Sequence, residues 1–170
     1  KHCDTYALFG EPRAQVTQLM SRINAEAARH RRQPNFNLSF RPIIGATEEE
    51  AWRKAKAILA GVEASGGGGG HGVPQAETAR RLMRLIEGGE IQDECLWVPI
   101  AAAAKGSGNS TALVGTAEQV AEAIAKYYDL GVKGVLIRGF DPFNDAIEYG
   151  HELIPQIREK VAARDAARTA

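Results

Sequence analysis

Two short segments of the sequence end in residues that could bind an anionic ligand. In the first, Phe36–Arg41, apolar and polar residues alternate. Such alternation is typical of a strand with two different faces, so Asn37, Ser39 and Arg41 would share the polar face. An inward-facing cation at the end of a strand is costly unless it meets a ligand, water or another polar group. Arg41 therefore either faces a ligand or forms an ion pair with a carboxylate of the protein.

The second segment, Arg138-Gly139-Phe140, follows a fully apolar run of the kind found in parallel sheets. Arg138 could hold an anion, or it could pair with Asp141 or Asp145. Gly139 would allow either the close approach of a planar group to the backbone or a tight turn. Both segments thus place a cation where a buried strand ends.

A third cation lies in a loop of small residues that runs from Lys105 to Thr111. The loop lacks the phosphate-loop pattern and its strand-to-helix setting, which argues against a nucleotide triphosphatase. We expect either a mobile loop that brings Lys105 onto an anionic substrate or a solvated surface lysine. The chain also has no Ser-His-Asp spacing, nucleophile elbow or close carboxylate pair, so hydrolytic mechanisms have no support.

The elements that must position these residues alternate along the chain. Strands are expected at 5–9, 36–41 and 134–137, and helices at about 12–32, 47–62, 75–87, 116–130 and 143–163. The region from about 63 to 115, which contains five consecutive glycines, breaks this pattern and is interpreted as a mobile insertion or lid.

This alternation predicts an α/β protein with a parallel sheet. Three strands cannot close a barrel, but they fit the last three units of a (β/α)₈ barrel, a fold that needs ~250 residues. Residues 1–170 are therefore expected to be the C-terminal portion of a single barrel domain. In such a barrel the working face is the carboxyl end of the strands, which selects Phe9, Ser39, Arg41 and the segment from Arg138 to Phe140.

Composition excludes several other classes of protein. Lys+Arg and Asp+Glu both number 21, so no charge excess suggests nucleic acid or an anionic membrane surface as partner. No apolar run approaches the ~20 residues that span a bilayer. The two cysteines and four histidines are scattered, so neither a disulfide framework nor a metal site is expected, and a cytoplasmic location is the default. The start at Lys1 resembles neither a signal peptide nor a natural start.

Five segments in order resemble the luciferase-like flavin monooxygenases, with the alkanesulfonate monooxygenases as the nearest branch. They cover most of the chain: Tyr6–Pro12, Phe36–Trp52, Thr111–Ala121, Asp129–Phe140 and Tyr149–Pro155. The resemblance implies a barrel enzyme that binds reduced FMN, supplied by a separate NAD(P)H-dependent flavin reductase, and uses O2 to oxygenate a small organosulfur compound. The insertion would close over the flavin and exclude water. Barrels of this class commonly form homo-oligomers.

The resemblance also assigns roles to the candidate residues. Arg41 and Lys105 would act in catalysis by holding the anionic group of the substrate. Phe9, Ser39, Arg138, Gly139 and Phe140 would line the cofactor site. The sulfonate enzymes carry Arg-x-His where this chain has Ser39-Phe-Arg41, a tyrosine at Phe140 and an arginine at Lys105.

These departures leave two alternatives open. One is a deazaflavin-dependent oxidoreductase of the same fold, and the other is a flavin-binding homologue without catalysis. The resemblance implies that the flavin-phosphate residues and the active-site cysteine lie in an N-terminal part of the barrel that precedes this chain. Because most of the barrel and the phosphate site are absent, we expect the chain by itself to be an incomplete, inactive fragment.

Overall fold

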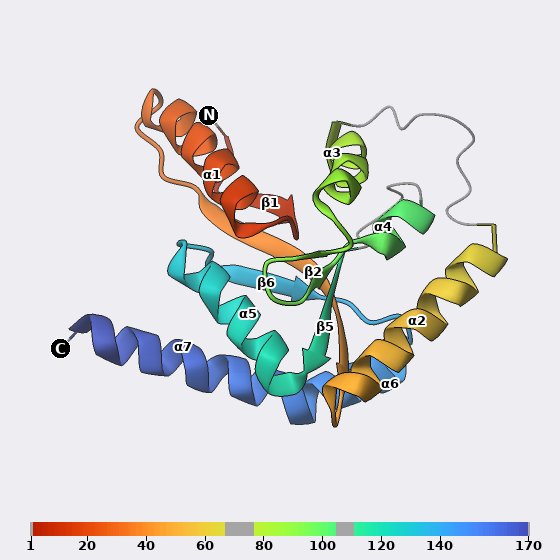
Figure 1. Cartoon of the computed structure of the whole chain (residues 1–170). Helices are drawn as coiled ribbons and strands as arrows, with labels where there is room; N and C mark the ends of the chain where they lie inside the picture. The colour runs from red at the N-terminus through yellow and green to blue at the C-terminus, as the bar shows by residue number, and fades with distance from the viewer. Residues whose placement is uncertain (1, 67–76, 105–110, 170) are drawn as a thin grey trace.

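The computed structural model describes residues 2–66, 77–104 and 111–169, which form an open, curled sheet with helices packed against it (Figure 1). The strands are β1 (Thr5–Phe9), β2 (Asn35–Gly45), β3 (Ile91–Gln92), β4 (Leu96–Trp97), β5 (Ala112–Thr116) and β6 (Gly134–Ile137). The helices are α1 (Arg13–Ala28), α2 (Glu48–Ala64), α3 (Glu77–Leu85), α4 (Pro99–Ala103), α5 (Ala117–Asp129), α6 (Pro142–Glu148) and α7 (Ile154–Thr169). Among these described helices, none has the length and apolar character needed to cross a membrane.

The long strand β2 organises the sheet. Its first half pairs in parallel with β1 and with β6, and its second half pairs in parallel with β5. From β5 the sheet continues through two short antiparallel strands, β4 and β3. β1 and β6 both run parallel to β2 and end beside its middle, β1 at Phe9 opposite Ser39 and β6 at Ile137 opposite Phe40. This confirms the prediction of an α/β protein with a parallel sheet.

The first half of β2 has the two faces that its sequence predicts. Phe36, Leu38 and Phe40 are buried in the main core, where side chains of α1 and α5 pack against them. Asn37 and Ser39 lie half-buried on the opposite face. The apolar face therefore anchors the strand, and the polar face is left to build a site.

The predicted end of this strand at Arg41 is wrong, because β2 continues to Gly45 and pairs there with β5. Proline lacks an N–H, so Pro42 normally argues against a strand interior. The Arg41 N–H points to β5 and donates to the Thr111 carbonyl over 3.0 Å, so Pro42 faces the other edge. There β6 has already ended, and no ladder bond is lost.

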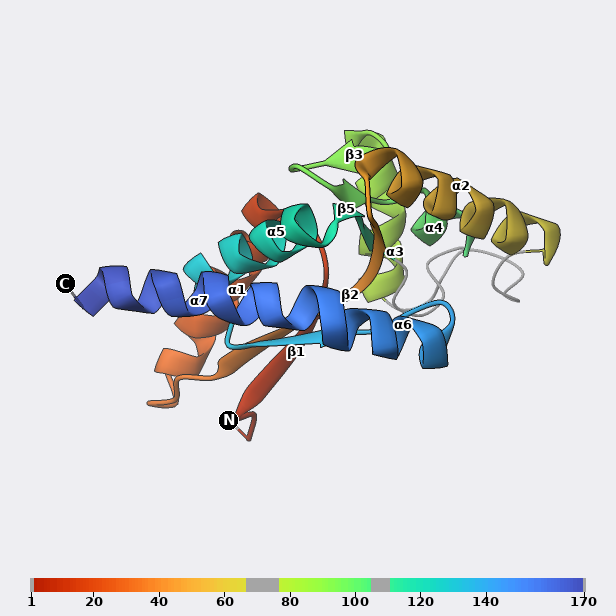
Figure 2. The same cartoon turned by 90° about the horizontal axis from the view of Figure 1, so that it is seen from below.

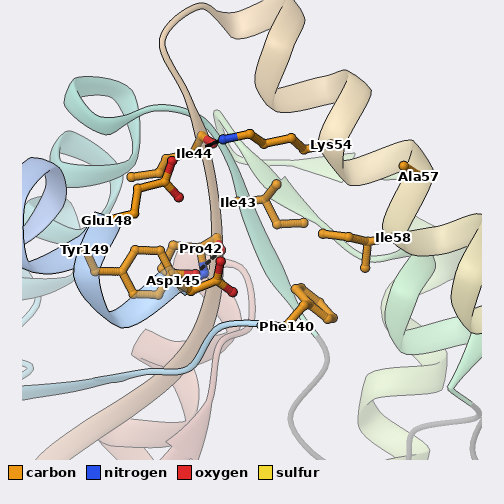
Figure 3. Close-up of a pocket in the computed structure, with 10 residues that line it drawn as sticks. All are labelled: Pro42, Ile43, Ile44, Lys54, Ala57, Ile58, Phe140, Asp145, Glu148 and Tyr149. Atoms are coloured by element: carbon orange, nitrogen blue, oxygen red, sulfur yellow. Dashed lines mark hydrogen bonds and ion pairs between the residues drawn. The ribbon is translucent and has the colours of Figure 1, made fainter. Parts of the chain in front are cut away.

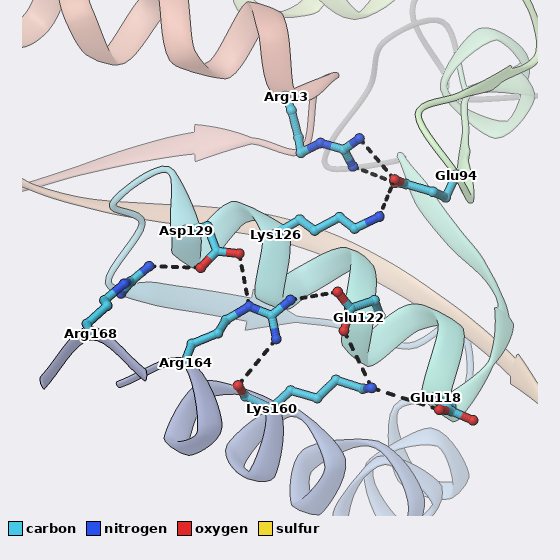
Figure 4. A network of polar contacts seen from close by, with 9 residues as sticks. All are labelled: Arg13, Glu94, Glu118, Glu122, Lys126, Asp129, Lys160, Arg164 and Arg168. Atoms are coloured by element: carbon cyan, nitrogen blue, oxygen red, sulfur yellow. Dashed lines mark hydrogen bonds and ion pairs between the residues drawn. The ribbon is translucent and has the colours of Figure 1, made fainter. Parts of the chain in front are cut away.

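The predicted last helix, 143–163, is also too short. The chain instead runs through α6, a π turn at Tyr149–Leu153 and α7, which ends at Thr169 (Figure 2). Ion pairs hold this tail against α5, as Arg164 binds Glu122 and Asp129, and Arg168 binds Asp129 (Figure 4). These charges explain why an Ala/Arg-rich end stays helical.

A second group of charges predicts that the stability of the fold depends on pH. Hydrogen bonds from Arg13 first, and also from Lys126, lower the pKa of Glu94 to about 2. A carboxylate with a lowered pKa stabilises the fold above its unfolded pKa, and that contribution is lost as the pH falls towards 2. Because the Glu94 side chain is 44% exposed, we expect its ionised form to stabilise the fold by about 1 kcal/mol or less.

The measurement is urea unfolding of the wild type and of Glu94→Gln between pH 7 and pH 2.5. The difference in free energy of unfolding should be constant above about pH 5 and shrink below it. Glu118→Gln is the control, since the Glu118 side chain is 79% exposed and only approaches Lys160 at 4.0 Å. A Glu94 difference that does not change with pH would contradict this prediction.

The two cysteines should differ sharply in reactivity. Cys95 is buried before β4, and burial raises the pKa of its thiol to about 12, whereas Cys3 is exposed. Because the thiolate is the reacting form, Cys95 should react at least roughly 10³-fold more slowly than an ordinary exposed thiol. A disulfide-exchange reagent should therefore titrate one thiol in the folded chain and two in urea. Rapid modification of both thiols without denaturant would rule out this packing of Cys95.

Candidate functional site

The open face of β1, β2 and β6 presents a polar residue between two apolar ones. The strand register places Phe9 opposite Ser39 and Ser39 opposite Leu136. The Leu136 side chain is 50% exposed, and Phe9 is half-buried. This row lies where β1 and β6 end, beside the middle of β2.

Arg41 lies two residues after Ser39 along β2, where the turn after β6 contacts it. Its Nη1 donates a hydrogen bond to the Gly139 carbonyl over 2.7 Å, and its guanidinium stacks over the Phe140 ring at 4.7 Å. Burial first, and the nearby Arg138 second, lower the pKa of Arg41. An arginine stays charged nonetheless, so the site carries a positive charge.

Beyond Arg41 the same face of β2 is covered. Ile43 packs there with Trp97 of β4 in a second apolar cluster, and Ile58 of α2 and Phe140 pack against that cluster. Next to them lies a pocket of about 300 Å³, the α2–α6 pocket (Figure 3). Arg41 therefore marks the boundary between the open part of the face and its covered part.

The polar groups of the α2–α6 pocket serve the fold. The Tyr149 hydroxyl donates to the Pro42 carbonyl over 2.5 Å, and the Lys54 ammonium donates to the Ile44 carbonyl over 2.9 Å and to Glu148 over 3.1 Å. Burial raises the pKa of Tyr149, so its hydroxyl keeps its proton. These side chains cap the edge of β2 that β6 leaves uncovered, which blocks further strand pairing.

Gly139 and Arg138 belong to the turn that follows β6. A Cβ at Gly139 would lie 2.0 Å from Asp145 Oδ2, so glycine is needed there for the close approach of Asp145. Within residues 111–169, Arg138 forms no ion pair with Asp141 or Asp145. Those carboxylates bind backbone N–H groups of the turn instead. The ion-pair alternative for Arg138 is therefore wrong.

The carboxyl end of β1 is fixed by contacts that no local sequence pattern indicates. The Glu11 side chain, 5% exposed, pairs with Arg81 of α3. The Glu11 carbonyl accepts a hydrogen bond from the Tyr127 hydroxyl over 2.8 Å. Glu11 thus ties α3, in the predicted insertion, to the edge of the sheet where the site lies. No local pattern around Glu11 pointed to Arg81, 70 residues away.

Two side-chain acceptors near the site are buried without a hydrogen-bond partner in the described part of the chain: Asn37 Oδ1 and Thr111 Oγ1. Asn37 lies on the same face as Ser39, two residues earlier along β2. Lys105, the other predicted catalytic residue, lies outside the described residues. Where side chains are described, no group of three or more His, Cys, Asp or Glu residues could hold a metal ion.

The fold and site together define a class of protein. Three adjacent parallel strands, each followed by a helix, form a curled sheet whose candidate site lies where β1 and β6 end. That is the arrangement of a (β/α)₈ barrel, of which the described sheet is a part.

Comparison with solved structures gives the same fold. A riboflavin lyase, solved with modified FMN and its substrate riboflavin, matches with a TM-score of 0.65 and 18% identity over 94% of this chain and 39% of that one. A long-chain alkane monooxygenase matches with a TM-score of 0.63 and 17% identity, over 94% and 37% of the two chains. EDTA monooxygenase from Chelativorans sp. BNC1 matches with a TM-score of 0.56 and 20% identity, over 92% of this chain and 40% of that one.

This chain thus spans about two fifths of the length of these three structures. Residues 1–134 match the family of luciferase-like monooxygenases. The chain belongs to that family, and its sheet is a fragment of the family's barrel.

Proposed function

We propose that this chain is the C-terminal part of a two-component monooxygenase that uses reduced FMN and O2 to oxygenate a small, anionic organosulfur compound. The observation that carries the proposal is the cation at the boundary of the open face. Arg41, held by Gly139 and Phe140, lies directly beyond the row of Phe9, Ser39 and Leu136. A separate NAD(P)H-dependent reductase would supply the reduced flavin.

The open face matches the ring system of a flavin in its combination of apolar and hydrogen-bonding groups. Such a ring is flat and largely apolar but carries hydrogen-bonding groups along one edge. The apolar side chains of Phe9 and Leu136 flank the polar Ser39, and the buried Asn37 Oδ1 is an acceptor without a donor in the described part. Arg138, exposed at the end of β6, would face an anionic part of the cofactor. When bound, reduced FMN supplies the electrons and activates O2.

The residues of this chain would bind and orient the substrate. Arg41 would hold its anionic group through charge-assisted hydrogen bonds, and Lys105 would add a second positive charge. Phe140 keeps the guanidinium in place by stacking and cannot itself move a proton. The covered wall of Ile43, Ile58 and Trp97 would exclude water from one side of the site.

We also propose that the isolated chain is inactive. Within its described part, β1 and β6 each pair with β2 alone, so the outer edges of these two strands are unpaired there and the face around Ser39 is open. The other strands of a barrel would be needed to enclose a flavin.

Sulfite release tests the proposed reaction. The intact gene product would be mixed with a flavin reductase, NADH, FMN and a panel of alkanesulfonates under air, with the isolated 170-residue chain assayed in parallel. We expect sulfite from the intact product only, and none without O2. Failure of every sulfonate would overturn the substrate class, and turnover by the isolated chain would overturn its incompleteness.

A further inference from the structure

The turn between β6 and α6 is built around the carboxylate of Asp145. Asp145 Oδ2 accepts a hydrogen bond from the Asp141 N–H over 2.9 Å, and the Asp145 N–H donates to the Asp141 carbonyl over 2.9 Å. Asp141 in turn caps α6 by accepting from the Asn144 N–H over 3.3 Å. The first turn of the helix and the loop before it therefore form one hydrogen-bonded unit.

Gly139 packs directly against this carboxylate. A Cβ at position 139 would lie 2.0 Å from Asp145 Oδ2 and 2.3 Å from Asp145 Cβ, closer than any real contact. The Asp145 side chain therefore occupies the space beside the Gly139 backbone. This contact sets where the Gly139 carbonyl can lie.

Gly139 and Phe140 both contact the Arg41 side chain. The Gly139 carbonyl accepts from Arg41 Nη1 over 2.7 Å, and the Phe140 ring lies 4.7 Å from the guanidinium carbon. Both belong to the turn that Asp145 braces. A guanidinium held in advance loses less conformational entropy when it binds a ligand.

We propose that Asp145 is a positioning residue for Arg41. It braces the Gly139–Phe140 turn so that the carbonyl and the ring hold the guanidinium toward the open face. The inference rests on the proposed function, in which Arg41 binds the anionic group of the substrate. Asp145 acts through its hydrogen bond to the Asp141 N–H, so an asparagine, which keeps an acceptor oxygen but not the charge, should replace it.

The first test measures the order of the Arg41 side chain by ¹⁵N relaxation in the intact gene product. In Asp145→Ala we expect Arg41 to become as mobile as the exposed Arg138, while Asp145→Asn leaves it ordered. Ile147→Ala is the matched control, because Ile147 lies on the same helix with its side chain exposed. An ordered Arg41 in Asp145→Ala would overturn the proposal, as would equal loss of order in Asp145→Asn.

Gly139→Ala gives a second route to the same result. Its Cβ must displace Asp145, so it should also release Arg41 even if Asp145→Ala fails to fold. Spectra of core residues such as Leu38 report whether each variant is folded. A folded Gly139→Ala chain with an ordered Arg41 would contradict the proposal.

Steady-state kinetics of the intact gene product separate this inference from the proposed function. Asp145→Ala should raise KM for an alkanesulfonate by about tenfold with little change in kcat, and should have no further effect in an Arg41→Met background. If Arg41 loses order but KM is unchanged, the proposed role of Arg41 fails and the positioning stands. If the Arg41 side chain stays ordered in Asp145→Ala, the proposed positioning role of Asp145 is wrong whatever the kinetics show.

Discussion

Phe40→Ala should lower the free energy of unfolding by about 3–5 kcal/mol, the largest stability effect we expect from a single change. The Phe40 side chain is fully buried, and its ring packs against the Tyr127 ring in a tilted arrangement with centroids 5.1 Å apart. It also fills the space beside Gly10, where a Cβ would lie 2.1 Å from the ring. Removing the ring leaves a cavity between β1, β2 and α5, directly beneath the candidate site.

Urea unfolding followed by circular dichroism measures this loss. Tyr6→Ala is a matched control, because it removes an aromatic ring from neighbouring β1 whose side chain is 41% exposed. It should cost less than about 1 kcal/mol. Similar losses in both variants would show that Phe40 does not occupy the centre of the core.

Arg41→Met should lower kcat/KM of the intact gene product for an anionic substrate on the order of 10²-fold or more. Methionine keeps an unbranched apolar stem but removes the charge and the hydrogen bond to Gly139. Arg41→Lys should recover only part of the loss, because an ammonium lacks the planar fork and stacks less well on Phe140.

Two comparisons make this result specific. Arg138→Met should have a smaller effect on sulfonates, because Arg138 is exposed and lies outside the contact with Gly139 and Phe140. An uncharged organosulfur compound should be turned over equally by the wild type and Arg41→Met. An equal loss for charged and uncharged substrates would mean that Arg41 supports the fold and does not bind the anion.

Much of the fold could be predicted because its signals are local. The apolar runs gave the bounds of β1 and β6 as Thr5–Phe9 and Gly134–Ile137, and strict alternation gave both faces of β2. The second half of β2 was missed because its pairing with β5 joins residues about seventy positions apart, and Pro42 masked the continuation. Tolerance of that proline depends on which edge it faces, which one strand's sequence does not reveal.

The site could be predicted in part for a similar reason. A parallel fold requires strand ends to meet, so Phe9, Ser39, Arg41 and the turn after β6 were expected at one edge. The contact of Asp145 with Gly139 depends on the angle at which α6 leaves that turn. No spacing rule gives such an angle, so the contact of Asp145 with Gly139 became visible only in the structure.

An anaerobic fluorescence titration tests most directly whether the open face binds reduced FMN. The intact gene product would be titrated with reduced FMN, oxidised FMN and a deazaflavin. Clear preference for reduced FMN, weakened by Ser39→Ala or Phe9→Ala, is the expected result. Preference for the deazaflavin, or no flavin binding, would contradict the proposed monooxygenase.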